Sequence, residues 1–101
     1  MNNNVYYEII LNIMRRERNA YWESSHSKYP HRMPTFYIKM LFNKESVLEA
    51  TVPDMFRAMK DLCKQGYVIK HPDSRIGQAY WQLTEKAEEW FCIGVLKTVS
   101  P

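Results

Sequence analysis

Cysteine and glycine are scarce in this sequence, and no long apolar run occurs. The chain has two cysteines, Cys63 and Cys92, and three glycines among 101 residues. Two cysteines are too few for the disulfide framework of a small secreted domain, and both lie in apolar helical patterns, so we expect buried, reduced thiols. Without an uncharged apolar run of about 18 residues, the sequence offers no membrane-spanning helix.

The sequence also lacks the patterns that mark enzymes and exported proteins. There is no glycine-rich phosphate loop, and no histidine lies at metal-ligand spacing from a cysteine or carboxylate on a regular element. The start, Met1-Asn2-Asn3-Asn4, lacks the basic residues and apolar core of a signal peptide. We therefore expect a cytoplasmic protein that is not an enzyme and that needs no cofactor, metal ion or membrane.

What is present fits one small domain over residues 1–101. A hydrophobic content of 46%, with 14% aromatic residues, is enough for one core but not for two. Residues 1–23 predict an amphipathic helix, because apolar residues recur on one face: Val5, Tyr6, Ile9, Ile10, Ile13 and Met14. Residues 24–34 contain two prolines and few apolar side chains, which predicts a loop.

A helix-turn-helix is predicted for residues 35–66. Residues 36–42 form an apolar run that periodicity alone cannot assign to a helix or a strand, and we favour a helix. Asn43 is placed to cap a short helix that carries Val47 and Leu48. Residues 51–54 then begin the next helix with a threonine cap, a proline and an acid. The turn between these two helices would be residues 50–52.

The second half of the chain predicts a helix, a hairpin and a final helix. The apolar face of the first helix is made of Met55, Phe56, Met59, Leu62 and Cys63. Gly66 follows and closes that helix. Residues 67–83 predict a β-hairpin, because two β-prone runs flank a polar tip at residues 71–78. Thr84 is placed to cap a C-terminal helix over residues 84–97.

Two segments carry a resemblance to a known family: Leu62-Cys63-Lys64-Gln65-Gly66-Tyr67-Val68-Ile69 and Tyr80-Trp81-Gln82-Leu83-Thr84-Glu85-Lys86. They are similar to the recognition-helix end, the wing and the final-helix start of winged helix-turn-helix regulators of the bacterial MarR and PadR groups. The resemblance covers about the last half of the chain, and Ala87 stands where such regulators usually have glycine. It implies a mainly α fold with a small β-hairpin (α+β), binding to double-stranded DNA, and a homodimer formed through the N- and C-terminal helices.

The net charge of +3 is unevenly distributed. Residues 1–44 carry seven Lys or Arg against three Glu, residues 45–78 carry five against five acids, and the remainder carries two against three. The expected reading helix and wing are therefore neutral. Because phosphate neutralisation supplies most nonspecific affinity for DNA, the acids Asp54 and Asp61 weaken a DNA-binding interpretation unless each pairs with a neighbour such as Arg57.

Seven basic residues are predicted to contact DNA: Arg15, Arg16, Arg57, Lys60, Lys64, Lys70 and Arg75. Arg57 suits a bidentate contact to guanine, and the two lysines on the same helix suit phosphates. Lys70 and Arg75 lie on the predicted wing, where the winged-helix proteins that this chain resembles place a basic side chain in a minor groove. Arg15 and Arg16 belong with Arg18 to the densest basic cluster of the sequence. These arginines fit a solvent-exposed helix face as well as they fit a DNA contact.

The sequence leaves more than one function open. The first is a DNA-binding transcriptional regulator without a cofactor. The second is a protein-interaction module, for example a phage or mobile-element protein that blocks a host protein or repressor. A neutral reading face, an apolar C-terminus and aromatic residues expected to be exposed favour it: Tyr29, Tyr37 and Trp81. A third is an accessory role in replication or plasmid maintenance.

Two further features have two interpretations each. Five aromatic residues fit either the core or a pocket for a small effector: Tyr6, Tyr7, Tyr21, Trp22 and Phe36. The apolar C-terminal residues fit either a dimer interface or a cover over the core of the same chain.

Overall fold

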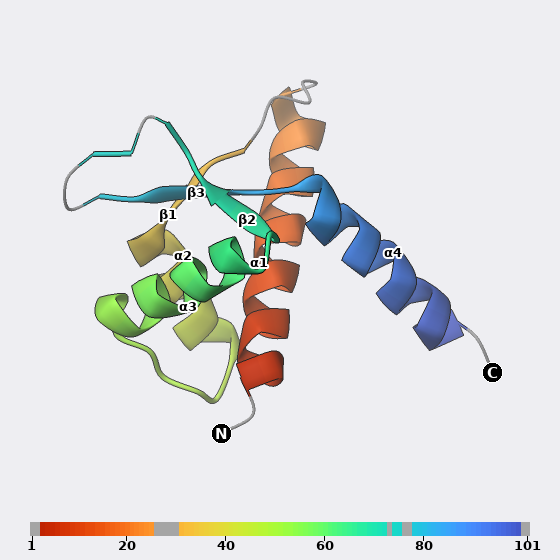
Figure 1. Ribbon diagram of the computed structural model, residues 1–101, viewed down its shortest axis with the longest axis horizontal. Coiled ribbons are helices and arrows are strands. Elements are labelled where there is room, and N and C mark those ends of the chain that lie inside the picture. The colour runs from red at the N-terminus through yellow and green to blue at the C-terminus, as the bar shows by residue number, and fades with distance from the viewer. Residues whose placement is uncertain (1–2, 26–30, 73, 76–77, 100–101) are drawn as a thin grey trace.

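The computed structural model describes residues 3–25, 31–72, 74–75 and 78–99 (Figure 1). In chain order its elements are α1 (Asn3–Ser25), β1 (Met33–Pro34), α2 (Thr35–Glu45), α3 (Val52–Lys64), β2 (Val68–Lys70), β3 (Tyr80–Leu83) and α4 (Glu85–Val99). The chain is mainly helical with a small antiparallel sheet, so the predicted α+β class is confirmed. No helix within these ranges is long and apolar enough to cross a membrane.

The sheet has three strands in the order β1-β3-β2, one strand more than the predicted hairpin. β2 and β3 pair antiparallel, as the hairpin prediction required. The additional strand β1 pairs Met33 with Trp81 and lies inside residues 24–34. The predicted loop is therefore wrong at both ends, because α1 continues to Ser25 and β1 begins at Met33. Residues 26–30 of that loop lie outside the described residues.

The core gathers the apolar faces of α1, α2 and α3 and the buried side of the sheet. Its fully buried side chains include Ile10, Met14, Ile38, Phe42, Met55, Met59, Leu62 and Val68. Within each helix they recur at three- and four-residue spacing, which places them on one face. Because burying a large apolar side chain contributes about 1.5 to 3 kcal/mol, this core is what holds α3 in a fixed position.

Trp81 joins the sheet to the helix pair. It lies on the central strand β3 with 2% of its surface exposed. Its Nε1 donates to Oγ1 of Thr35, at the start of α2, over 2.8 Å, and its ring centre lies 5.9 Å from that of Phe56 on α3. The prediction of an exposed Trp81 is therefore wrong. Tyr37 is half-buried, and Tyr29 lies outside the described residues.

The connection between α2 and α3 differs from the predicted one. α2 runs unbroken to Glu45, which confirms a helix over residues 36–42, and residues 46–51 are non-helical. The short helix expected after Asn43 is therefore absent from this described segment, and Val47 is fully exposed. Asn43 instead lies within α2, where its amide group donates to the Ala50 carbonyl over 2.9 Å and accepts from the Ala50 amide over 2.8 Å. The side chain closes the turn rather than capping a helix.

Replacing Asn43 with alanine is expected to destabilise the fold by about 1 to 3 kcal/mol, because both polar groups of the Ala50 peptide lose their partner. Asn43→Asp is the matched control, since it retains an acceptor but no donor, and its cost should be smaller. Urea unfolding followed by circular dichroism measures both values. Equal stability of the alanine variant and the wild type would show that the turn closes without this side chain.

Both ends of α3 are closed as the sequence predicts. The Thr51 hydroxyl accepts from the Asp54 amide over 3.2 Å, and the Asp54 carboxylate accepts from the Thr51 amide over 3.1 Å, which forms a capping box. At the other end Gly66 has a φ of 88°, a conformation that strains residues with a side chain. The Tyr67 amide then donates to the Leu62 carbonyl over 3.0 Å. These contacts fix where α3 begins and where the hairpin leaves it.

α4 starts at the end of β3 and runs away from the hairpin (Figure 1). Thr84 caps it as predicted, because its hydroxyl accepts from the amide at the third helical position over 3.4 Å. Two contacts tie α4 to α1. Arg18 pairs with Glu88, and the Arg15 guanidinium lies 4.9 Å from the centre of the Phe91 ring.

Both cysteines are free, but neither is fully buried, so the predicted burial of the two thiols is wrong. Cys63 is half-buried on α3, and Cys92 is exposed on α4. Among the α4 residues whose side chains the structure describes, 85–92, Ala87 and Phe91 are buried. They lie four positions apart on one helix face, and Cys92 lies outside that face.

Candidate nucleic-acid interface

All five predicted basic residues of α3 and the hairpin are exposed: Arg57, Lys60, Lys64, Lys70 and Arg75. The two lysines on α3 are four residues apart and share one helix face. The hairpin extends past the α2–α3 pair in Figure 1, and its two basic residues line a groove together with the first turn of α3. The fold therefore places basic side chains on α3 and on a hairpin that lies beside it.

Three of these cations are available to a ligand. The side chains of Lys64, Lys70 and Arg75 form no hydrogen bond or ion pair with another residue in the described ranges. A further cation, Lys60, has its Nζ 5.7 Å from the centre of the Phe56 ring. A phosphate oxygen is the anionic partner that such exposed ammonium and guanidinium groups bind in nucleic acids.

Backbone hydrogen bonds fix the position of Arg75 on the hairpin. Its amide donates to the Gln78 carbonyl over 3.0 Å, and its carbonyl accepts from the Gln78 amide over 2.9 Å. The preceding Ser74 accepts from the Tyr80 amide over 3.0 Å. The backbone of Arg75 is therefore held by Gln78, just before β3, while its side chain is exposed.

Both acids on α3 have partners within the chain. Asp54 bonds Thr51 and pairs with Arg57. The hydrogen bonds from Thr51, with a smaller contribution from the Arg57 cation, hold the pKa of Asp54 below its usual value. Asp61 accepts from the Tyr7 hydroxyl over 2.7 Å, and burial together with this bond raises the pKa of Tyr7 to about 12. Asp54 thus has a cationic partner in Arg57, whereas Asp61 is hydrogen-bonded by a neutral hydroxyl and keeps its negative charge.

Arg57 keeps most of its guanidinium open to solvent. Its side chain is 71% exposed, and one terminal nitrogen donates to Asp54. The remaining donors have no partner among the described residues. A guanidinium held on one side by a carboxylate is oriented, and its free N–H groups can address the edge of a base.

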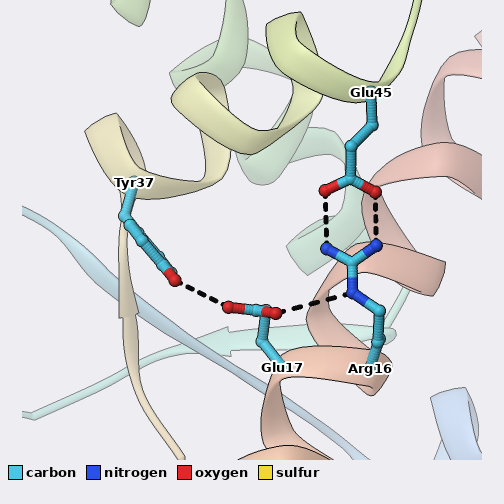
Figure 2. Close-up of polar contacts among 4 residues, drawn as sticks. All are labelled: Arg16, Glu17, Tyr37 and Glu45. Carbon is cyan, nitrogen blue, oxygen red and sulfur yellow. Dashed lines mark hydrogen bonds and ion pairs between the residues drawn. The ribbon is translucent and has the colours of Figure 1, made fainter.

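The N-terminal arginines contact other elements instead. Figure 2 shows Arg16 held by both carboxylate oxygens of Glu45 on α2, with its Nε 3.5 Å from Glu17. Glu17 in turn accepts from the Tyr37 hydroxyl over 2.6 Å. Arg15 lies over Phe91 of α4. The two arginines therefore face α2 and α4, and their partners, such as Glu45 at a separation of 29 residues, gave no signal in the sequence.

The Arg16–Glu45 pair is expected to make the stability of the fold depend on pH. The hydrogen bonds and charge of Arg16 lower the pKa of Glu45. A carboxylate with a lowered pKa in the folded state stabilises the fold above its unfolded pKa, and this contribution disappears as the pH falls through the folded pKa. We expect Glu45→Gln to lose less stability than the wild type between about pH 5 and about pH 3. The difference should stay below about 1 kcal/mol, because the pair is exposed.

Urea unfolding of the two proteins at each pH measures this dependence. Glu17→Gln is a useful comparison, because it removes a carboxylate from the same network (Figure 2) and leaves the Arg16–Glu45 pair intact. If the stability of the wild type and that of Glu45→Gln fall in parallel as the pH is lowered, the Arg16–Glu45 pair does not contribute to the pH dependence.

A groove between the first turn of α3 and the hairpin was not predicted. Its volume is about 560 Å³, and its apolar walls are Phe36, Val52, Pro53 and Phe56. These residues come from the starts of α2 and α3, and the opposite wall comes from the hairpin. No local sequence pattern marks such a groove, because it exists only once three separate elements have packed together.

The aromatic residues considered for an effector pocket do not share one cavity. Tyr6 and Tyr7 line a hollow of about 400 Å³ beside α3, whereas Phe36 lines the groove at the hairpin. The ring of Tyr21 stacks on His31, with 4.7 Å between their centres. Among the residues that the structure describes, no three His, Cys, Asp or Glu side chains cluster as a metal site requires.

Comparisons of the chain with protein-family models, curated proteins and solved structures find no match. A function for the chain therefore has to follow from the placement of its own charged and apolar groups.

Proposed function

We propose that this chain is a winged helix-turn-helix protein that binds double-stranded DNA and regulates transcription. The order of its elements supports the fold, since a helix pair, α2–α3, is followed by a β2–β3 hairpin in the place of a wing. In this proposal α3 enters the major groove and the hairpin contacts the flanking DNA. The strand β1, which pairs with β3, anchors the hairpin to the start of α2.

The observation that carries the proposal is the set of uncompensated cations on α3 and the hairpin. Lys64, Lys70 and Arg75 are exposed and unpaired within the described residues, while Asp54 of α3 is paired with Arg57. Phosphate contacts from such residues position a protein on DNA and supply its salt-dependent affinity. The proposed surface leaves out Arg15 and Arg16, because their side chains already contact α4 and α2.

Arg57 is the proposed base-reading residue. Arg57→Ala is expected to cost about 1 to 3 kcal/mol in affinity for the preferred site and to flatten the preference at one base pair, because a bidentate contact to guanine is lost. Selection of binding sites from a random duplex library, run in parallel for the wild type and the variant, measures the change in preference.

Arg57→Lys is the matched control, since it keeps the charge but not the planar fork of donors. Its affinity for random DNA should resemble that of the wild type, while its base preference should resemble that of Arg57→Ala. An unchanged consensus site in both variants would remove Arg57 from the reading surface.

A homodimer completes the proposed arrangement. In Figure 1, α1 lies between α4 and the α2–α3 pair, and α4 runs away from the hairpin, so a two-fold contact through α4 and the neighbouring side of α1 would leave both hairpins accessible. Two reading helices related by such an axis bind half-sites about 34 Å apart, which corresponds to one turn of DNA. The selected sites are accordingly expected to be palindromic.

A further inference from the structure

The groove between α3 and the hairpin exposes large apolar side chains. Phe36 has 51% of its surface exposed and Val52 has 42%, and both line the groove together with Phe56. Single exposed apolar residues are common on protein surfaces. Several that converge on one concave site, with a few polar groups at its edge, have the composition of a ligand-binding site.

The charged groups of this groove have one sign. Its described lining includes two cations, Lys70 and Arg75, and no carboxylate. The acids of α3, Asp54 and Asp61, line the other hollow, beside Tyr6. A ligand that brings negative charge to the hairpin side of the groove is therefore favoured electrostatically.

We propose that this groove binds a segment of a partner protein in which one or two apolar side chains are flanked by Asp or Glu. The apolar side chains pack against Phe36, Val52 and Phe56, and the carboxylates pair with Lys70 and Arg75. A DNA backbone matches the groove less well, because sugars and phosphates are too polar to fill an apolar cavity. Acidic peptide segments combine both kinds of group within a few residues.

Peptide and DNA binding would share two residues. Where the chain binds DNA as proposed above, Lys70 and Arg75 also contact phosphates, so an acidic segment in the groove excludes DNA from the hairpin. A partner protein that carries such a segment then releases the chain from DNA. This consequence rests on the proposed function, whereas the peptide site itself does not.

A library of random short peptides displayed on phage, selected against the full chain, provides the probe. The selected peptides are expected to share an apolar residue flanked by Asp or Glu. The best of them, synthesised with a fluorescent label, should bind at least about 10-fold more weakly to Val52→Asp, as for other residues at the centre of an interface. Val52 is exposed in the first turn of α3, where an acid is compatible with the helix. Circular dichroism verifies that this variant is folded.

Two further variants distinguish a general effect of added charge from an effect at the groove. Val47→Asp adds the same charge at a fully exposed residue outside the groove and should leave the peptide affinity unchanged. Lys70→Ala combined with Arg75→Ala should weaken binding and reduce its dependence on salt, because the carboxylates lose their partners.

Several results would overturn the peptide site. Selected peptides without acidic residues, or equal binding to Val52→Asp and the wild type, contradict it directly. Failure to select any peptide, together with a loss of DNA affinity in Val52→Asp but not in Val47→Asp, assigns the groove to DNA. Loss of self-association in Val52→Asp alone, seen in sedimentation, assigns it to a second copy of the chain. Because peptide binding is measured without DNA, absence of DNA binding leaves this result intact.

Discussion

Replacing Trp81 with alanine is expected to lower the free energy of unfolding by about 3 to 5 kcal/mol, the range observed for large aromatic residues in cores. Trp81 is 2% exposed and bridges three elements, since it lies on β3, packs against Phe56 of α3 and donates to Thr35 of α2. Its loss leaves a cavity and an acceptor without its donor. Because a small domain has a total stability of about 5 to 15 kcal/mol, the variant should be close to unfolding at room temperature.

The variant Trp81→Phe separates the contribution of apolar packing from that of the hydrogen bond to Thr35. It keeps most of the apolar volume and removes the indole N–H, so its cost should be about 1 to 3 kcal/mol, that of an unpaired buried polar group. Urea unfolding followed by circular dichroism measures both variants. An alanine variant within about 1 kcal/mol of the wild type, an effect typical of ordinary substitutions, would mean that Trp81 does not hold the sheet on the helices.

The parts of the fold that were predicted from the sequence are those with local causes. α3 has a periodic apolar face, a capping box between Thr51 and Asp54, and a glycine with positive φ at Gly66. Each of these signals depends on residues within one or two turns of each other. The same holds for the cap at Thr84 and for the strand pair on either side of the hairpin tip.

The parts that were missed depend on distant partners. β1 has only two residues, Met33 and Pro34, which is too short to show alternation, and it exists because β3 pairs with it. Asn43 was interpreted as a cap because caps are common for asparagine, but its partner is the Ala50 backbone across the turn. Trp81 is buried by residues of α2 and α3, and nothing adjacent in sequence indicates this.

In the candidate site, too, the features with local causes were predicted and those that depend on distant partners were not. The exposed positions of Lys60 and Lys64 follow from helical periodicity once α3 is identified. The pairing of Asp54 with Arg57 is local as well, at a spacing of three residues. In contrast, the hydrogen bond between Tyr7 and Asp61 spans 54 residues. Long-range contacts of this kind decide which charges remain available, and a single sequence does not reveal them.

Replacing both Lys64 and Arg75 with alanine is expected to weaken binding to duplex DNA of any sequence by roughly 10- to 100-fold at low salt. Each residue neutralises one phosphate in the proposal, so the slope of affinity against salt should fall by about 1 for each. Fluorescence anisotropy with a random-sequence duplex at several salt concentrations measures both quantities. The side chains are exposed and have no partner among the described residues, so the double variant should keep the wild-type stability.

The matched control removes two cations from α2, Lys39 and Lys44, and so produces the same change in net charge. Its salt slope should stay close to that of the wild type, because α2 does not carry the proposed phosphate contacts. Equal losses in the two double variants would mean that net charge alone governs binding and that the α3 and hairpin surface is not the DNA-binding surface.

Titrating the purified protein with random-sequence duplex DNA at about 50 mM and about 200 mM salt measures whether this chain binds double-stranded DNA. The sedimentation mass recorded alongside gives the oligomeric state. We expect a dimer whose dissociation constant for DNA lies in the range of about 1 to 100 μM and rises steeply with salt. Absence of binding at the lower salt concentration would exclude the proposed DNA binding and leave protein recognition as the function of the α3 and hairpin surface.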